Sequence, residues 1–355
     1  MDTKTTQRPS VAAVTGLIAD AMTAAGLPPD DAIKVAALMV EADLVGADAH
    51  GVFRLAQYIH RLKLGAVNKR PAIKVNRTAA ATALIDGDNA MGHLVVARAC
   101  ETAVEMAREA GVAWVGMHMS NHAGAGGVYA ALPLKADMIG IYAAVASANH
   151  MPMPGGADPL LGTNPLAIAI PAGEESPLVL DIATSVVSYG TIKNHRMKNE
   201  PLAPGWMVNP ETGEAVIDPH QSLHALLLPM GGYKGAGLAL MLGLLAGPLN
   251  GAMFGRECVD FNATPEKVAN TGQFVIALDP ARFQPLDAFK AEIDRHIREL
   301  RQSKTLPGQK IRLPGEERAK RIADRTANGL PLSPGLVKQL DELAAELSIK
   351  PLGAR

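Results

Sequence analysis

The sequence has few of the residues that define several large classes of protein. Only two cysteines, Cys100 and Cys258, occur among its 355 residues. They lie far apart and form no Cys-x-x-Cys motif, so we expect reduced thiols in a cytoplasmic protein rather than a disulfide framework. Aromatic residues make up 4% of the chain, which argues against surfaces that stack on nucleic-acid bases.

The chain also lacks a strong net charge and a long apolar run. Its formal net charge is -1 at pH 7, so no broad basic surface for nucleic acid is expected. The longest apolar run, 236–249, is broken by glycines and a proline and is too short to cross a bilayer. We expect a buried helix there. The first ten residues also have no apolar signal core. From these absences together, we expect a soluble protein with no nucleic-acid or membrane partner.

What the chain does contain favours an α/β enzyme. Nearly half of its residues are apolar, and short apolar strands are expected at 81–86, 112–117, 138–146, 166–170 and 274–278. Ser10 is expected to cap a first helix, and Asp30 a second helix that ends near Ala47. No Gly-x-Gly-x-x-Gly follows an early strand, so a Rossmann fold is not indicated. No His-Glu-x-x-His metal motif occurs either, and we expect no metal site.

The stretch from Ser120 to Tyr129 is the centre of the predicted site. His122 lies where the strand over 112–117 ends and a glycine-rich turn begins, a position that often exposes chemistry in α/β folds. The glycines at 124, 126 and 127 would let a substrate or cofactor approach the backbone. The alternative is an ordinary tight turn with a solvent-facing histidine.

A second cluster precedes it in the sequence. If 50–58 is helical, His50, Arg54 and Tyr58 fall four residues apart on one face. Such a stripe combines an arginine that binds carboxylates with side chains that exchange protons. The alternative is a solvated face on which Arg54 pairs with Asp48 or another carboxylate.

Small polar residues recur at three further strand ends. They are Ser147, the Gly162–Asn164 turn and the Asp181–Ser185 segment, and we expect them to share one crevice. A local basic cluster is expected on a solvated loop where it could bind phosphate; it consists of Lys193, His195, Arg196 and Lys198. The glycine-rich start of the helix near 233, with Lys234, is a plausible anion site, but it lacks the order of a P-loop.

Taken in order, these motifs resemble the malate/L-lactate dehydrogenase family that lacks a Rossmann fold. The matching pieces are Asp48–Leu55, Ser120–Gly124, Pro154–Gly156, Gly162–Pro165, Leu180–Ser185, Gly231–Leu238 and Pro314–Glu316. The resemblance implies an oxidoreductase that moves a hydride between NAD or NADP and C2 of a small 2-oxo or 2-hydroxy acid, or a cyclic imino acid. It also implies a homodimer. A helical domain over 1–75 and 319–355 would pack on an NAD(P)-binding α/β domain over 76–318.

The resemblance also assigns roles to residues. His122 and His50 are both candidates for the proton donor and acceptor, and Arg54 would hold the substrate carboxylate. Tyr58, Asn121 and Thr163 would join Arg54 around the substrate. The cofactor would lie against Ser147, Asn164, Asp181, Ile182, Ala183, Thr184, His195, Lys234, Gly315 and Glu316. The basic residues at 193, 195 and 196 tilt the choice slightly toward NADP.

Two departures from the family pattern bear on function. Ala49 stands where relatives usually have serine, and Gly243 where many have glutamate. The segment before Gly231 is also shorter than usual, which would reshape the rim of the pocket. The loss of the serine hydroxyl motivates a second hypothesis, a nucleotide-binding protein without catalysis. A third is a lyase or hydrolase that acts on a carboxylate through the two histidines.

Overall fold

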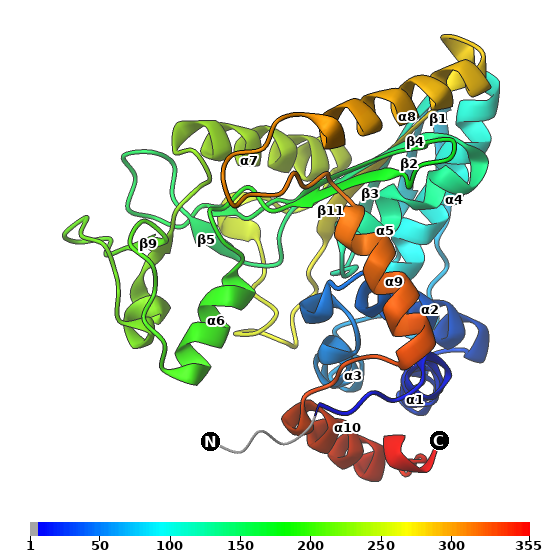
Figure 1. Ribbon diagram of the computed structural model, residues 1–355. Coiled ribbons are helices and arrows are strands. Elements are labelled where there is room, and N and C mark those ends of the chain that lie inside the picture. The colour runs from blue at the N-terminus through cyan, green and yellow to red at the C-terminus, as the bar shows by residue number, and fades with distance from the viewer. Residues whose placement is uncertain (1–5) are drawn as a thin grey trace.

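A seven-stranded sheet forms the centre of the computed structural model, which describes residues 6–355 (Figure 1). Its strand order is β1-β2-β3-β11-β4-β7-β8, and all neighbours are antiparallel except the parallel pair β2–β3. The strands are β1 (Lys74–Ala79), β2 (Thr82–Asp86), β3 (Val112–Ser120), β11 (Thr271–Leu278), β4 (Ile139–Ala144), β7 (Leu166–Ile170) and β8 (Leu178–Ile182). The α/β class and the strands expected from the sequence are therefore confirmed.

The two faces of the sheet are covered by different helices. On β11, Val275 and Ala277 pack with α4 (Gly92–Ala110), whereas Phe274 and Ile276 pack with α7 (Tyr233–Ala246). The short helix α5 (Gly126–Ala130) lies on the α4 side. This alternation follows from the two-residue period of a strand, and it buries β11 on both faces.

Helices from both ends of the chain form a second core. They are α1 (Val11–Ala24), α2 (Pro29–Leu44), α3 (Leu55–Lys63) and α10 (Pro334–Glu346). Ser10 caps α1 as predicted, because its Oγ accepts a hydrogen bond from the Ala13 N–H at 3.1 Å. The prediction for α2 is wrong at both ends. Pro28 is the N-cap residue, which leaves Asp30 in the first turn, and the helix ends at Leu44 before Gly46 turns the chain with φ +87°.

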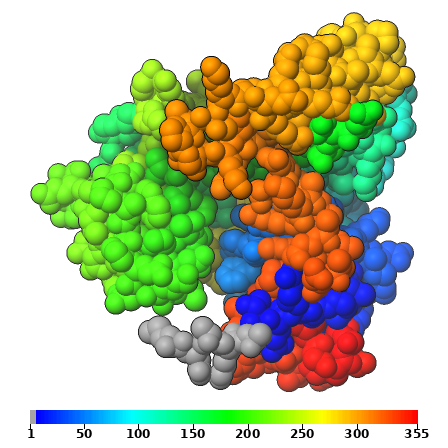
Figure 2. Space-filling view, viewed as in Figure 1, coloured from blue at the N-terminus to red at the C-terminus, as the bar shows by residue number. Residues whose placement is uncertain are grey.

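A third core gathers residues between 151 and 239. It contains β5 (Asn149–Met151), β6 (Leu161–Gly162), β9 (Met207–Val208), β10 (Leu226–Leu227) and α6 (Tyr189–Lys198). The loop predicted over Lys193–Lys198 is wrong, because α6 runs through it from an N-cap in which Ser188 Oγ accepts the Thr191 N–H. In Figure 2 this lobe, mostly green, is set apart by a furrow from the blue and orange helices.

Two further helices complete the chain. Helix α8 is Leu286–Gln302, and α9 (Glu316–Asn328) runs from the sheet down to α2 (Figure 1). Short 3₁₀ turns connect the elements: Asp48–His50 (η1), Val52–Arg54 (η2), Leu132–Ala136 (η3), Pro219–His224 (η4), Pro248–Asn250 (η5), Gly255–Glu257 (η6), Pro280–Arg282 (η7) and Leu352–Ala354 (η8).

Helix α7 differs from the buried helix that the sequence predicted. Its small residues Gly235, Ala236, Ala239 and Gly243 are buried, but Met241 is 57% exposed and Tyr233 is 72% exposed. One face of α7 is therefore apolar and open. None of the helices described over 6–355 is both long and apolar enough to span a membrane.

Candidate active site

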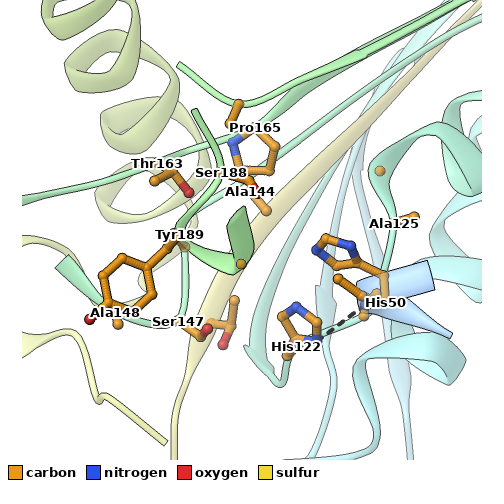
Figure 3. Close-up of a pocket in the computed structure, with 18 of the residues that line it drawn as sticks. His50, His122, Ala125, Ala144, Ser147, Ala148, Thr163, Pro165, Ser188 and Tyr189 are labelled. Atoms are coloured by element: carbon orange, nitrogen blue, oxygen red, sulfur yellow. Dashed lines mark hydrogen bonds between the residues drawn. The ribbon is translucent and has the colours of Figure 1, made fainter. Parts of the chain in front are cut away.

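A cavity of about 350 Å³ lies where the three cores meet. The helical core contributes 47–54, the sheet contributes 122–126 and 142–148, and α6 contributes Tyr189, Gly190 and Lys193. Figure 3 shows His50 and His122 on one side of the cavity and Tyr189 with Ala148 on the other. Its volume falls within the range of small-molecule sites.

His122 is held from behind by a tyrosine. The Tyr58 hydroxyl lies 2.6 Å from His122 Nδ1, and the Gly124 N–H donates to the same nitrogen at 3.4 Å. Gly124 has φ +84°, a conformation that favours glycine. Because the Tyr58 hydroxyl can donate to Nδ1 or accept from its N–H, this contact holds the ring in either tautomer, and Nε2 is left for a ligand.

His50 lies beside His122 with its ring nearly parallel. The ring centroids are 5.8 Å apart and the rings are inclined by 17°. Burial and the Arg54 charge lower the pKa of His50 to about 4. Burial is also the largest cause that lowers the pKa of His122 well below its usual value, and Arg54 adds to it. In the absence of an anion, both rings are therefore neutral at pH 7.

The segment that carries His50 and Arg54 is not the continuous helix that the sequence predicted. Gly51 separates η1 from η2, and α3 starts only at Leu55. Asp43 fixes this break: its Oδ2 accepts the Val52 N–H at 2.8 Å, and its carboxyl group packs against Gly51 so closely that a Cβ there would clash. His50 and Arg54 nevertheless both line the cavity, while Tyr58 reaches it through His122.

Arg54 faces the cavity without a carboxylate partner in the described chain. Its Nε donates to the Ala49 carbonyl at 2.8 Å and its Nη1 to Gln57 Oε1 at 3.0 Å. The ion pair considered with Asp48 is wrong, since Asp48 binds Arg325 of α9 instead. The guanidinium is thus oriented by neutral oxygens and keeps its charge for an anionic ligand.

The predicted crevice between strand ends is confirmed in its main part. Ser147, Thr163, Asp181 and Ala183 all line the cavity. The Asp181 carboxylate also accepts the Gly127 N–H at 2.8 Å, and burial raises its pKa. Gly127 therefore makes room for Asp181, whereas Gly124 and Gly126 line the cavity as the sequence suggested.

Several predicted site residues form hydrogen bonds within the protein instead of facing the cavity. Asn164 is buried, and its amide bridges the Ala146 N–H and the Ala239 carbonyl. Thr184 Oγ1 donates to the Thr163 carbonyl. Asn121 bonds to Asn89, Ala90 and Arg61. These side chains shape the cavity walls from behind.

Other predicted residues lie outside the cavity lining. His195 Nδ1 bonds to the Pro201 carbonyl, and Lys234 is exposed at the start of α7. Gly315 packs on β8, where a Cβ would lie 2.8 Å from the Val179 nitrogen. Glu316 pairs with Arg301. Ile182 lies on β8 next to Asp181.

Sequence reasoning missed part of the lining. His150 stacks on Tyr189 with ring centroids 3.8 Å apart and planes inclined by 7°. Phe261 comes from a loop far along the chain and packs 5.5 Å from the His122 ring. Tyr189 and Lys193 are four residues apart, a spacing that places two side chains on one face of a helix. The sequence could not use this signal, because that segment was expected to be a loop.

The two departures from the family pattern have different consequences. Ala49 lines the cavity next to His50, so the missing hydroxyl belongs to the site. Gly243 is buried in α7, where an added Cβ would lie 2.7 Å from Asn164 Nδ2 and clash with Phe254. The protein is packed too tightly there for a longer side chain.

Comparisons with known proteins agree with this geometry. The family model described as malate/L-lactate dehydrogenase matches residues 10–341. The chain is 35% identical to the malate/(S)-sulfolactate dehydrogenase of Methanothermus fervidus over 94% of its own length and 96% of that protein. It is 32% identical to the ureidoglycolate dehydrogenase (NAD(+)) of Escherichia coli O157:H7 over 85% of each chain.

A solved structure shares the whole architecture. The sulfolactate dehydrogenase from Methanocaldococcus jannaschii superposes with a TM-score of 0.90 at 34% identity, covering 98% of this chain and 99% of that one. The match thus includes the sheet, both sets of helices and the segments that surround the cavity. The chain belongs to the malate/L-lactate dehydrogenase family and is an oxidoreductase.

Proposed function

We propose that this protein transfers a hydride between a nicotinamide dinucleotide and C2 of a small 2-hydroxy or 2-oxo acid. One observation carries the proposal: His122, oriented by Tyr58, and an arginine without an acidic partner face the same cavity. The second candidate substrate is a cyclic imino acid. It has the same carboxylate next to the carbon that accepts the hydride, and the family resemblance includes such reductases.

The residues divide the work between binding and proton transfer. Arg54 holds the substrate carboxylate and so places C2 at a fixed point. In the neutral tautomer whose Nδ1–H donates to Tyr58, His122 Nε2 takes the hydroxyl proton during oxidation and returns it during reduction. His50 is the other candidate for this role, but among the described residues no side chain fixes its ring by a hydrogen bond. A bound nicotinamide supplies or accepts the hydride.

The cavity walls fit such a cofactor. Ala144, Ala146, Ala148 and Ala183 are small and leave room for a flat ring, while Ser147, Thr163 and Asp181 offer groups that bind ribose hydroxyls. A relative is named as NAD(+)-dependent. The sheet has one parallel pair, β2–β3, which supports a dinucleotide site other than the Rossmann fold.

For the choice of dinucleotide, the sequence slightly favours NADP. In the structure, however, the three basic side chains diverge. Lys193 lines the cavity, His195 bonds to Pro201, and Arg196 donates to Ser222 Oγ at 3.3 Å. They form no common phosphate site. The proposal therefore names a nicotinamide dinucleotide, and a binding titration with NADPH and NADH distinguishes NADP from NAD.

We also propose that the protein is a cytoplasmic homodimer with the two domains expected from the sequence. The open face of α7 supports a second copy. Met241, Leu244, Leu245 and Leu249 are all exposed on or just after this one helix. Contiguous apolar patches of this kind mark protein interfaces.

A fluorescence titration with NADH and, separately, NADPH tests the proposal first, followed by turnover on 2-hydroxy acids, 2-oxo acids and cyclic imines. We expect binding of a dinucleotide and turnover of at least one class. His122→Ala should lower kcat by about 10² to 10⁴-fold, and Arg54→Ala should also raise the substrate KM. Near-normal kinetics in both variants would refute these roles.

A further inference from the structure

Lys193 is a cavity-lining cation with no acidic partner. It lies one turn after Tyr189 on α6, and no described carboxylate oxygen lies within 4.0 Å of its Nζ. The Tyr189 ring lies between two neighbours: it stacks on His150, and Lys193 Nζ lies 5.6 Å from its centroid. The lysine is thus directed by an aromatic wall rather than by an ion pair.

The same cavity already contains Arg54. Partial burial is the main cause that lowers the pKa of Lys193, and the positive charge of Arg54 contributes next, while the carboxylate of Asp260, beyond ion-pair distance, partly offsets them. The two cations therefore repel each other across the cavity. A ligand that places a negative charge at each of them removes both the repulsion and the cost of partial desolvation.

Binding of a cofactor phosphate is a poor explanation for the position of Lys193 in the cavity. A phosphate is usually bound by several convergent donors, and the nearest basic neighbours on α6 are directed elsewhere, to Pro201 and to Ser222. Lys193 instead shares its cavity with the cation that is proposed to hold the substrate. The second negative charge is therefore best placed on the substrate itself.

We propose that Lys193 determines specificity for dianionic substrates by binding the second acidic group of a 2-hydroxy or 2-oxo acid whose first carboxylate lies on Arg54. This rests on the proposed function. The substrate would then be a dicarboxylate, or a carboxylate with a sulfonate at its far end, rather than a monocarboxylate. The reacting carbon lies between the two anchored ends, so the second ion pair also helps to position C2.

The test compares Lys193→Gln with Lys198→Gln, an exposed lysine of the same helix that does not line the cavity. Malate and lactate serve as dianionic and monoanionic substrates. In Lys193→Gln we expect kcat/KM for malate to fall by about 10 to 100-fold, as for loss of a charged hydrogen bond. Lactate should change by less than about threefold, and Lys198→Gln should change neither.

Three results would overturn the inference. One is an equal loss for malate and lactate, which would indicate a general structural effect. Another is a large loss of NADPH affinity in Lys193→Gln, which would assign the lysine to the cofactor. The third is a wild-type protein that uses lactate as efficiently as malate.

A binding measurement separates this inference from the proposed function. Calorimetry with succinate and butyrate, two acids that cannot react, measures the second charge without turnover. If the wild type turns over no substrate but binds succinate more tightly than butyrate, and Lys193→Gln loses that difference, the proposed function fails while the assignment of a second anion site to Lys193 stands. If substrates are turned over but the succinate preference survives in Lys193→Gln, the inference fails alone.

Discussion

At the scale of single residues, the Tyr58–His122 pair governs how the cavity handles a proton. Tyr58 is buried, and among the described residues His122 is its one side-chain hydrogen-bond partner. A hydroxyl can donate to a neutral Nδ1 or accept from a protonated one. When Nε2 gains or loses the substrate proton, Nδ1 keeps its own proton and donates it to the Tyr58 hydroxyl, so the contact holds the ring in one orientation throughout.

Replacing Tyr58 with phenylalanine tests this account. The ring volume is kept and only the hydrogen bond is lost, so we expect kcat to fall by about tenfold with dinucleotide affinity unchanged. Tyr233→Phe, on the exposed start of α7, is the matched control. Steady-state kinetics and a dinucleotide titration provide the two readouts. An unchanged kcat in Tyr58→Phe would show that His122 needs no orienting partner.

The lowered pKa of His122 predicts the pH dependence of the reaction. Oxidation of a hydroxy acid needs the neutral ring, so kcat/KM should hold its plateau below pH 6.5 and fall only at the lowered pKa. Reduction needs the protonated ring, so kcat/KM in that direction should fall as pH rises through the same value. Profiles measured in both directions check this. An acid limb at or above 6.5 in the oxidation profile would contradict it.

At the scale of elements, the break between η1 and η2 places His50 and Arg54. Asp43→Ala would leave the Val52 N–H without its acceptor, which costs about 1–3 kcal/mol of stability. We also expect a higher KM for the carboxylate substrate, because the turn that carries Arg54 loosens. Asp43→Asn keeps an acceptor oxygen and should restore KM. Denaturant unfolding and kinetics measure both effects, and a normal KM in the alanine variant would refute the positioning role.

The open face of α7 predicts an interface between two copies. Met241→Glu combined with Leu245→Lys places charges on that face and should convert a dimer into a monomer. Leu306→Glu changes a leucine that is 75% exposed outside α7 and serves as the control. Light scattering after gel filtration gives the masses. A dimer that persists in the double variant would place the interface on another surface.

At the scale of the whole molecule, buried neutral histidines tie folding stability to pH. His93 is 1% exposed, neither ring nitrogen has a hydrogen-bond partner in the described chain, and burial lowers its pKa to about 3. The unfolded chain takes up this proton near the ordinary value of 6.5. The stability that His93 contributes is therefore complete above that pH and is lost progressively as the pH falls toward 3.

Replacing His93 with leucine removes this proton uptake. Between pH 7 and pH 5 the wild type should lose about 2 kcal/mol more unfolding free energy than His93→Leu. His60→Gln, at an exposed position of α3, should behave as wild type. Urea unfolding at the two pH values measures the difference. Equal losses in the wild type and His93→Leu would mean that the buried ring is already protonated or solvated.

Local sequence predicted the elements that hydrophobic periodicity and caps determine. Ser10 caps α1, and the apolar run from Leu166 to Ile170 is β7. The same reasoning failed where a single long-range contact decides the backbone. Asp43 breaks the segment around Gly51, and the packing of Gly243 against Phe254 holds α7 with only one face buried.

In the site, too, the sequence predicted some features and only the fold decided others. Motif reasoning brought His50, Arg54, His122, Thr163 and Asp181 to one cavity. It could not tell that Asn164 and Thr184 bond inward, because a motif fixes the identity of a polar residue and not the direction of its side chain. Nor could it add His150 or Phe261, whose ring partners Tyr189 and His122 lie far away in sequence.

The sequence by itself determined the fold class, the family and the residue types available for proton transfer and carboxylate binding, because these depend on local patterns and their order. Only the tertiary structure decided that β11 enters between β3 and β4, that three cores meet around one cavity, and that Lys193 and Arg54 both line it. Those features come from packing between distant segments, whose free energy is not encoded in any single stretch of the chain.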